Sequence, residues 1–138
     1  LEYLRLGNNK ISTIKDGAFE ALVNLKTLYL NGNQLEEIPE LPISTLEYLS
    51  FGNNEISTIN DGAFEALVNL KTLHLWGNPF KCDCALSWML DISTSILGNN
   101  EIQCSSPPEH SGKFIRVISR EDLCLGEFLK ISKSCMKV

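Results

Sequence analysis

The chain has 138 residues, 43% of them hydrophobic, and a formal net charge of -5 at pH 7. This length allows one domain with a continuous core, and the excess of 17 Asp and Glu over 12 Lys and Arg argues against binding to a nucleic-acid backbone, which clustered positive charge recognises. All of the net negative charge lies in residues 1–78, which hold five basic and ten acidic residues, whereas residues 79–138 hold seven of each.

The first 79 residues contain an internal duplication. Residues 1–34 and 46–79 align without gaps, and 27 of the 34 positions are identical. Each copy contains two shorter units, which begin LEYLRLGNN and LKTLYLNGN in the first copy. The four units start at Leu1, Leu25, Leu46 and Leu70. They fit the pattern LxxLxLxxNx[LI], except that Phe51 replaces a leucine and the fourth unit breaks at Pro79. Repeats of this period are typical of a solenoid, in which neighbouring units bury each other's apolar face.

The alternation within LxxLxL predicts one short strand in each unit, with the leucines on its buried face. The pattern resembles the leucine-rich repeats over residues 1–78. This resemblance implies an α/β-type solenoid with a curved parallel sheet on its concave face. It also implies an asparagine ladder, in which the amide after each strand satisfies buried backbone groups of neighbouring coils. The ladder residues are Asn9, Asn33, Asn54 and Asn78.

The segments between strands differ in length and composition. Phe19 and Phe64 occupy matching positions in the two 24-residue units, and we expect their rings to stack as a spine on the convex side. The 21-residue unit has no such phenylalanine, and Pro39 and Pro42 fix an extended segment there instead.

After Asn78 the repeats give way to a segment with four spaced cysteines, which are Cys82, Cys84, Cys104 and Cys124. Their spacing resembles the C-terminal cap of secreted repeat proteins such as Slit, platelet glycoprotein Ib, Toll ectodomains and variable lymphocyte receptors. That resemblance implies that Cys82 pairs with Cys104 and Cys84 with Cys124, whereas the residues alone leave all three pairings open. A helix around Ala85–Ile92, with Trp88 packed inward, is expected to close the apolar end of the solenoid.

The competing interpretation of these cysteines is a zinc site that includes His74 or His110. Cys-x-Cys is a poor zinc pair, so we expect disulfides, no metal and no cofactor. Disulfides indicate an oxidising compartment, and therefore secretion or display on a cell surface. The fifth cysteine, Cys135, is either a free thiol or an intermolecular bridge. The expected organisation is repeats over residues 1–78, a cap over 79–124 and a tail over 125–138.

The polar strand positions are the candidate ligand-binding surface, because repeat solenoids usually bind on the concave side. Exposed aromatic residues on a sheet indicate that something packs on them, and Glu2, Glu47 and Glu55 predict an acidic surface. The candidate residues are Glu2, Tyr3, Arg5, Tyr29, Asn31, Glu47, Tyr48, Ser50, Glu55, His74 and Trp76.

The seven differences between the two copies bear on the same surface. Three of them occupy outward strand positions, namely Arg5/Ser50, Tyr29/His74 and Asn31/Trp76, whereas the convex run DGAFEALVNLKTL is unchanged. A diversified binding surface would show this pattern. Neutral sequence drift at solvent-exposed positions, which packing does not constrain, would produce the same pattern.

The sequence indicates binding rather than catalysis, since it has no metal-binding helix motif, phosphate loop or nucleophile elbow. The alternating unit lengths resemble small leucine-rich proteoglycans, whereas the cap resembles variable-lymphocyte-receptor-like and Toll-like recognition proteins. The second resemblance implies an immune-type receptor that binds a protein or glycan of a microbial surface, or an antigen, through the concave face. The alternative is a matrix or guidance adhesion module, proteoglycan-like or Slit-like, that binds a host protein.

The sequence predicts no transmembrane segment, because no stretch approaches the roughly 18 uninterrupted apolar residues that cross a bilayer.

The first strand raises a question of assembly. It has no preceding coil as the sequence stands, so its apolar residues are covered either by further residues or by a second copy. The second case predicts a homodimer through this end or through the concave rim.

Overall fold

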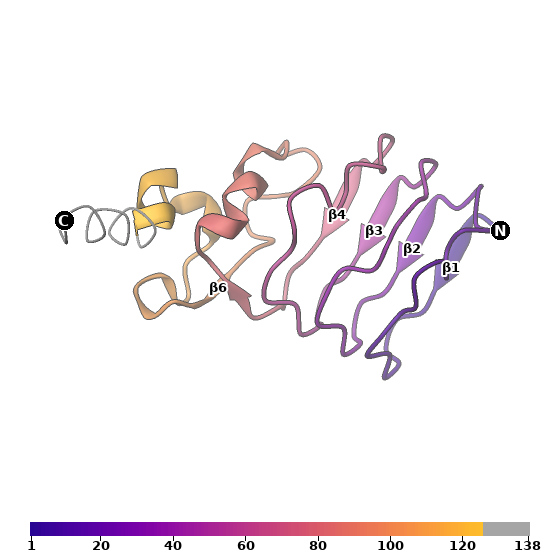
Figure 1. Ribbon diagram of the computed structural model, residues 1–138, viewed down its shortest axis with the longest axis horizontal. Coiled ribbons are helices and arrows are strands. Elements are labelled where there is room, and N and C mark those ends of the chain that lie inside the picture. Colours follow the sequence, from indigo (N-terminus) through magenta and orange to yellow (C-terminus); the bar gives the residue numbers. More distant parts are fainter. Residues whose placement is uncertain (126–138) are drawn as a thin grey trace, which may run out of the picture.

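A computed structural model describes residues 1–125 and shows a row of parallel strands followed by a cap (Figure 1). Strands β1 (Tyr3–Arg5), β2 (Thr27–Tyr29), β3 (Tyr48–Ser50) and β4 (Thr72–His74) form one sheet in chain order. Every pair is parallel and in register, so that each central leucine lies beside the central leucine of the next strand. The predicted leucine-rich-repeat fold, with one strand for each unit, is therefore confirmed.

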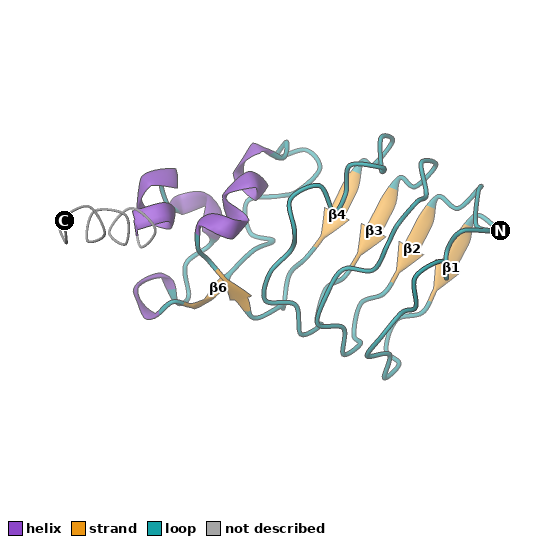
Figure 2. Cartoon of the chain, in the orientation of Figure 1, coloured by secondary structure: helices purple, strands orange, loops and turns teal. Residues whose placement is uncertain are grey.

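The core lies directly behind this sheet. The leucines that alternate with the outward residues are fully buried in the inner coils, as are Phe51 and Phe80, whereas Leu4 and Leu6 of the first coil are half-buried. Burial of each such side chain contributes about 1.5–3 kcal/mol. The return segments of the four units contain turns, and the helices of residues 1–125 lie in the cap (Figure 2).

The asparagines that follow the strands connect successive coils. Asn54 is buried; its Oδ1 accepts from the backbone N–H of Leu35 at 3.0 Å, and its Nδ2 donates to the carbonyls of Leu30 and Phe51 at 3.0 and 2.9 Å. Asn33 and Asn78 make equivalent bonds. Asn9 is exposed and bonds only to carbonyls of its own turn. These bonds satisfy backbone groups that the short strands leave unpaired.

The expected phenylalanine spine is wrong in one respect. Phe19 is buried in the core, but Phe64 pairs with Trp88 of the cap, at 6.2 Å between ring centroids, rather than with Phe19. The reason is the intervening 21-residue unit, which places prolines where the longer units have phenylalanine. Phe64 therefore joins the last repeat to the cap.

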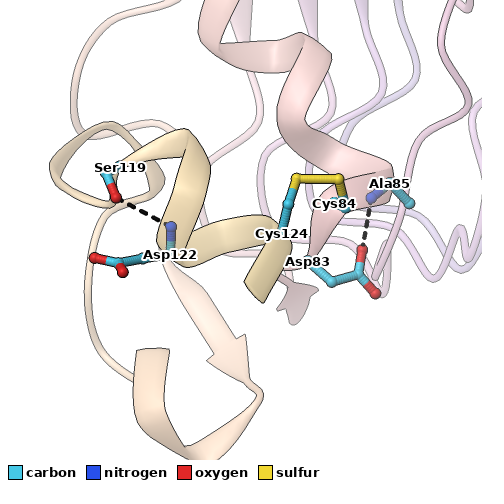
Figure 3. The surroundings of a disulfide bond; sticks show 6 residues. All are labelled: Asp83, Cys84, Ala85, Ser119, Asp122 and Cys124. Carbon is cyan, nitrogen blue, oxygen red and sulfur yellow. Dashed lines mark hydrogen bonds between the residues drawn. A yellow bond between two sulfur atoms is a disulfide. The ribbon is translucent and has the colours of Figure 1, made fainter. Parts of the chain in front are cut away.

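The cap begins with β5 (Phe80–Lys81), which pairs with β6 (Cys104–Ser106) in a second, two-stranded sheet. Between them lies a 3-10 helix, η1 (Cys84–Asp91), whose first turn is capped by the Asp83 carboxylate bonded to the N–H of Ala85 (Figure 3). Two short 3-10 helices, η2 (Pro108–His110) and η3 (Ile115–Val117), precede a helical segment over residues 120–125.

Two disulfides fasten this cap. Cys82 is bonded to Cys104 and Cys84 to Cys124, which confirms the pairing that the resemblance implied (Figure 3 shows the second bond). The zinc interpretation is wrong, because all four sulfur atoms are engaged in disulfides and supply no thiolate ligands. Cys135 lies outside the described residues.

The expected helix, η1, covers the C-terminal end of the apolar core of the repeats. Trp88 of η1 is half-buried, and its indole N–H donates to the carbonyl of Ile59 at 3.1 Å. Arg116 donates to the carbonyls of Ile92 and Leu97, both at 2.8 Å, and so holds the segment after η1 in place. Within residues 1–125 there is no helix of the length and hydropathy that a membrane crossing requires.

Candidate functional site

The outward residues of β1–β4 form the exposed face of the sheet, which we call the concave face. Four of them form a continuous line across all four strands, which we call the aromatic row. The guanidinium carbon of Arg5 lies 5.4 Å from the centre of the Tyr29 ring, Tyr29 lies 5.0 Å from Tyr48, and Tyr48 lies 5.4 Å from His74. Arg5, Tyr29 and His74 occupy equivalent positions of their strands, and their register partner on β3 is the small Ser50. Tyr48 lies one outward position earlier on β3, and its ring contacts Tyr29 on one side and His74 on the other.

Ser50 does not belong to the accessible surface, which corrects the expectation for this residue. It lies between Tyr29 and His74 in the register of the sheet, and the larger side chains around it leave it 3% exposed. Tyr3 and Trp76, by contrast, are 58% and 43% exposed. Glu55 is exposed but lies beyond the asparagine turn, outside the strands.

The row ends at Glu101, a cap residue that the sequence interpretation missed. Its Oε1 accepts a hydrogen bond from Nδ1 of His74 at 2.7 Å, and its Oε2 accepts from the backbone N–H groups of Leu75 and Trp76 at 2.9 and 3.2 Å. The carboxylate thus occupies the edge at which a fifth strand would pair. The pentapeptide GNNEI of residues 52–56 recurs at residues 98–102, and this recurrence is the signal that could have identified Glu101.

Replacement of Glu101 by alanine is expected to lower the free energy of unfolding by about 2 kcal/mol, because bonds to a charged acceptor contribute about 1.5–3 kcal/mol and the N–H groups lose their partner. Urea denaturation measures the change. Glu55→Ala is the matched control, since Glu55 is the fourth residue of the same pentapeptide, as Glu101 is, but is exposed. This control should change stability by less than about 0.5 kcal/mol. Equal effects of the two variants would contradict the conclusion that Glu101 stabilises the edge of the sheet.

The concave face is balanced in charge, not acidic as expected. Lys26 lies 4.0 Å from Glu2, and Lys71 lies 2.7 Å from Glu47. The lysines are neighbours of the glutamates because the alternate units begin LE and LK. The negative charge of the repeats therefore lies outside the strands, on Asp16, Glu20, Glu36, Glu37, Glu40, Glu55, Asp61 and Glu65.

Two ionisable groups of this face have shifted pKa values. The pKa of Glu47 is lowered by its hydrogen bond to Lys71 and by the charge of that lysine, so the carboxylate keeps its charge to lower pH. The pKa of Tyr48 is raised, first by burial and then by Tyr29 and Glu101. Its phenol therefore stays neutral at physiological pH and can donate a hydrogen bond to a ligand.

The next outward column differs between the two copies. A Cβ added at Gly52 would lie 2.7 Å from Cε2 of Trp76, so the indole rests on the Gly52 backbone. At the equivalent place in the first copy, a Cβ added at Gly7 would lie 3.0 Å from Oδ1 of Asn31. Trp76 and Asn31 therefore each lie over a glycine, and the absence of a side chain there lets them approach the sheet.

Comparison with known proteins agrees with this architecture. Two family models match, one described as "Leucine Rich repeats (2 copies)" over residues 1–42 and one described as "Leucine rich repeat" over residues 43–80. Human 5T4 (Wnt-activated inhibitory factor 1, trophoblast glycoprotein) is similar in structure, with a TM-score of 0.77 and 23% identity; the match covers 90% of this chain and 47% of that one.

A second similar structure is a chain of the octameric complex of Latrophilin 3 (Lec, Olf), Unc5D (Ig, Ig2, TSP1) and FLRT2 (LRR). The TM-score is 0.57 at 23% identity, and the match covers 88% of this chain and 54% of the other. The present chain thus spans about half the length of the structures that it matches. At this identity the likeness establishes the fold.

Proposed function

Because this chain is a leucine-rich-repeat protein whose repeats are closed by a disulfide-bonded cap, we propose that it is a non-catalytic extracellular recognition module that binds a protein through its concave face. The aromatic row is the observation that carries this proposal. Tyrosine and arginine dominate the binding energy of protein interfaces, and here they lie in one line on the sheet.

The row is suited to binding because its side chains are already ordered. Each ring packs against the next, and Glu101 holds His74 from the cap side. A ligand that contacts them has less side-chain entropy to remove, and the cost of immobilising a side chain on binding is about 0.5–1.5 kcal/mol. The balanced charge of this face also avoids the desolvation of a large unpaired charge.

The disulfides support an extracellular location. Bonds such as Cys82–Cys104 and Cys84–Cys124 form and persist in oxidising compartments and are rare in the cytosol. The protein therefore meets its ligand after secretion or at a cell surface.

For the ligand class, we propose immune-type recognition of a microbial surface protein or an antigen. The differences between the two copies support it: Arg5, Tyr29 and Asn31 and their counterparts lie on the concave face, while the convex run is unchanged. A surface whose contacts vary on a constant framework suits the recognition of varied ligands.

The second candidate is adhesion or guidance through a host protein. The structural similarity to a chain of the complex of FLRT2 with Latrophilin 3 and Unc5D favours it, since that complex joins a leucine-rich-repeat protein to other proteins. The two candidates share the binding face and differ in the partner.

A binding panel separates the candidates. The purified, oxidised protein is exposed in parallel to whole bacteria, to microbial surface extracts and to host matrix proteins and receptor ectodomains, and the bound fraction is quantified. Saturable binding to the microbial arm supports immune-type recognition, and saturable binding to one host protein supports adhesion. Equal retention by every surface would contradict specific recognition of either kind.

A further inference from the structure

Three of the seven differences between the two copies lie around one hollow on the concave face. A hollow of about 320 Å³ is lined by Arg5, Gly7, Asn8, Tyr29 and Asn31. Three of these residues, Arg5, Tyr29 and Asn31, are among the seven positions that differ between residues 1–34 and residues 46–79. The other two, Gly7 and Asn8, have identical counterparts in Gly52 and Asn53.

The equivalent place in the second copy is filled. The Trp76 indole covers Gly52, which is buried, and Ser50 is buried beside it. In the first copy the shorter Asn31 replaces the indole and Gly7 is only half-buried. The sequence divergence therefore opens a hollow in one copy and closes it in the other.

The residues of the hollow are suited to bind a group that carries one negative charge. Among residues 1–125 the structure gives Arg5 no ion pair and no side-chain hydrogen bond, and its guanidinium lies over the face of Tyr29 at 5.4 Å. The planar guanidinium matches a carboxylate through two parallel hydrogen bonds. The amide of Asn31 adds a donor at the same opening.

The surroundings favour a carboxylate over a polyanion. Arg5 is the cation of this hollow, and the chain as a whole carries a net charge of -5. A sulfated glycan or a nucleic acid needs several clustered cations and would be repelled by the acidic residues of the repeats. One carboxylate group needs one guanidinium and a neighbouring amide donor.

We propose that Arg5, Tyr29 and Asn31 form a subsite that receives an aspartate or glutamate side chain of the protein ligand. This inference rests on the proposed function, because it assigns one contact within the concave-face interface. The Tyr29 ring fixes the guanidinium from one side, and the carboxylate approaches it along the open edge beside Asn31.

The test uses the full chain, labelled with ¹⁵N, and two blocked peptides, acetyl-Gly-Glu-Gly-amide and acetyl-Gly-Gln-Gly-amide. We expect the glutamate peptide to shift the Arg5 Nε–H and Asn31 Nδ2–H resonances saturably, and the glutamine peptide to bind at least about tenfold more weakly, since the charge-assisted bonds are lost. Equal shifts with the two peptides would overturn the subsite.

Variants taken from the chain's own second copy provide the controls. Arg5→Ser and Asn31→Trp install residues that stand at the equivalent positions of a folded unit, and Arg5→Ser should weaken the glutamate peptide about tenfold or more. Arg5→Lys keeps the charge without the planar fork and should give an intermediate loss. An unchanged affinity in Arg5→Ser would refute the assignment.

The reverse exchange tests for gain of the subsite. Ser50→Arg with His74→Tyr and Trp76→Asn recreates the first copy's residues in the second and should raise the number of bound glutamate peptides from one to two. A count that stays at one in the folded variant would contradict the role of these three positions. If the peptides fail while variants of Tyr29 and Tyr48 still abolish ligand binding, the subsite is wrong and the concave-face function stands.

Discussion

Loss of the disulfide between Cys82 and Cys104 is expected to lower the free energy of unfolding by about 3 kcal/mol and the melting temperature by roughly 10 °C. The two residues are 22 positions apart, and the bond restricts the unfolded chain over that loop. Both sulfur atoms are also buried, beside Phe80 at the end of the core. The bond is thus part of the packing that closes the last repeat.

The measurement is thermal unfolding of Cys82→Ala with Cys104→Ala, on a Cys135→Ser background that prevents disulfide exchange. The matched control removes the other bond through Cys84→Ala with Cys124→Ala, whose side chains are only half-buried. We expect a smaller fall in melting temperature for this control, because it removes the restraint on the unfolded chain but little buried packing. A melting temperature unchanged within about 2 °C in the first variant would contradict the stabilising role of the cap.

The second large effect is expected at Asn54. Replacement by alanine removes three short hydrogen bonds and leaves the N–H of Leu35 without this partner, whereas the carbonyls of Leu30 and Phe51 keep their bonds from Asn33 and Asn78. One unsatisfied buried group costs about 1–3 kcal/mol and each further lost bond about 1 kcal/mol, so we expect a loss of about 3 kcal/mol in urea denaturation.

Asn9 provides the control for this prediction, because it occupies the same position of the first unit. Its amide is exposed and bonds only within its own turn, so water replaces those bonds when the side chain is removed. Asn9→Ala should cost less than about 1 kcal/mol. Similar losses for the two variants would show that the ladder position matters through local turn formation and not through contacts between coils.

Much of the fold could be predicted from the sequence because the repeat imposes it. Four copies of LxxLxL place the leucines inward and the polar positions outward, and their common register follows because the spacing within this motif is the same in every unit. The cap could be predicted for a similar reason, since the spacing of its four cysteines resembles that of known caps. In the structure, both the sheet and the two disulfides agree with this prediction.

The errors arose where a residue depends on neighbours that the repeat does not specify. Ser50 has an outward strand position, but its exposure depends on the larger side chains of adjacent units. Glu101 lies in the cap, and the recurrence of GNNEI marks this residue without predicting its contact with the edge of the sheet. The acidic surface is predicted from the three glutamates Glu2, Glu47 and Glu55, whereas the charge of the face also depends on which residues become their neighbours, as the pairing of Glu47 with Lys71 shows.

The proposed homodimer, the role of Cys135 and the ligand class stay predictions. The concave-face assignment can be tested without knowledge of the ligand class, because Tyr29 and Tyr48 lie at the centre of the aromatic row. The convex side offers matched controls in Val23 and Val68, which are 68% and 76% exposed and belong to the unchanged run.

The most direct test is therefore the dissociation constant of the ligand captured by the panel, measured for Tyr29→Ala with Tyr48→Ala and for Val23→Ser with Val68→Ser. Melting temperatures of both variants first establish that they are folded. Binding through the concave face predicts a loss of at least about 30-fold, or ~2 kcal/mol, for the tyrosine variant and less than about threefold for the valine variant. Retained affinity in the tyrosine variant, with a loss in the valine variant, would place the ligand on the convex side and contradict the proposed function.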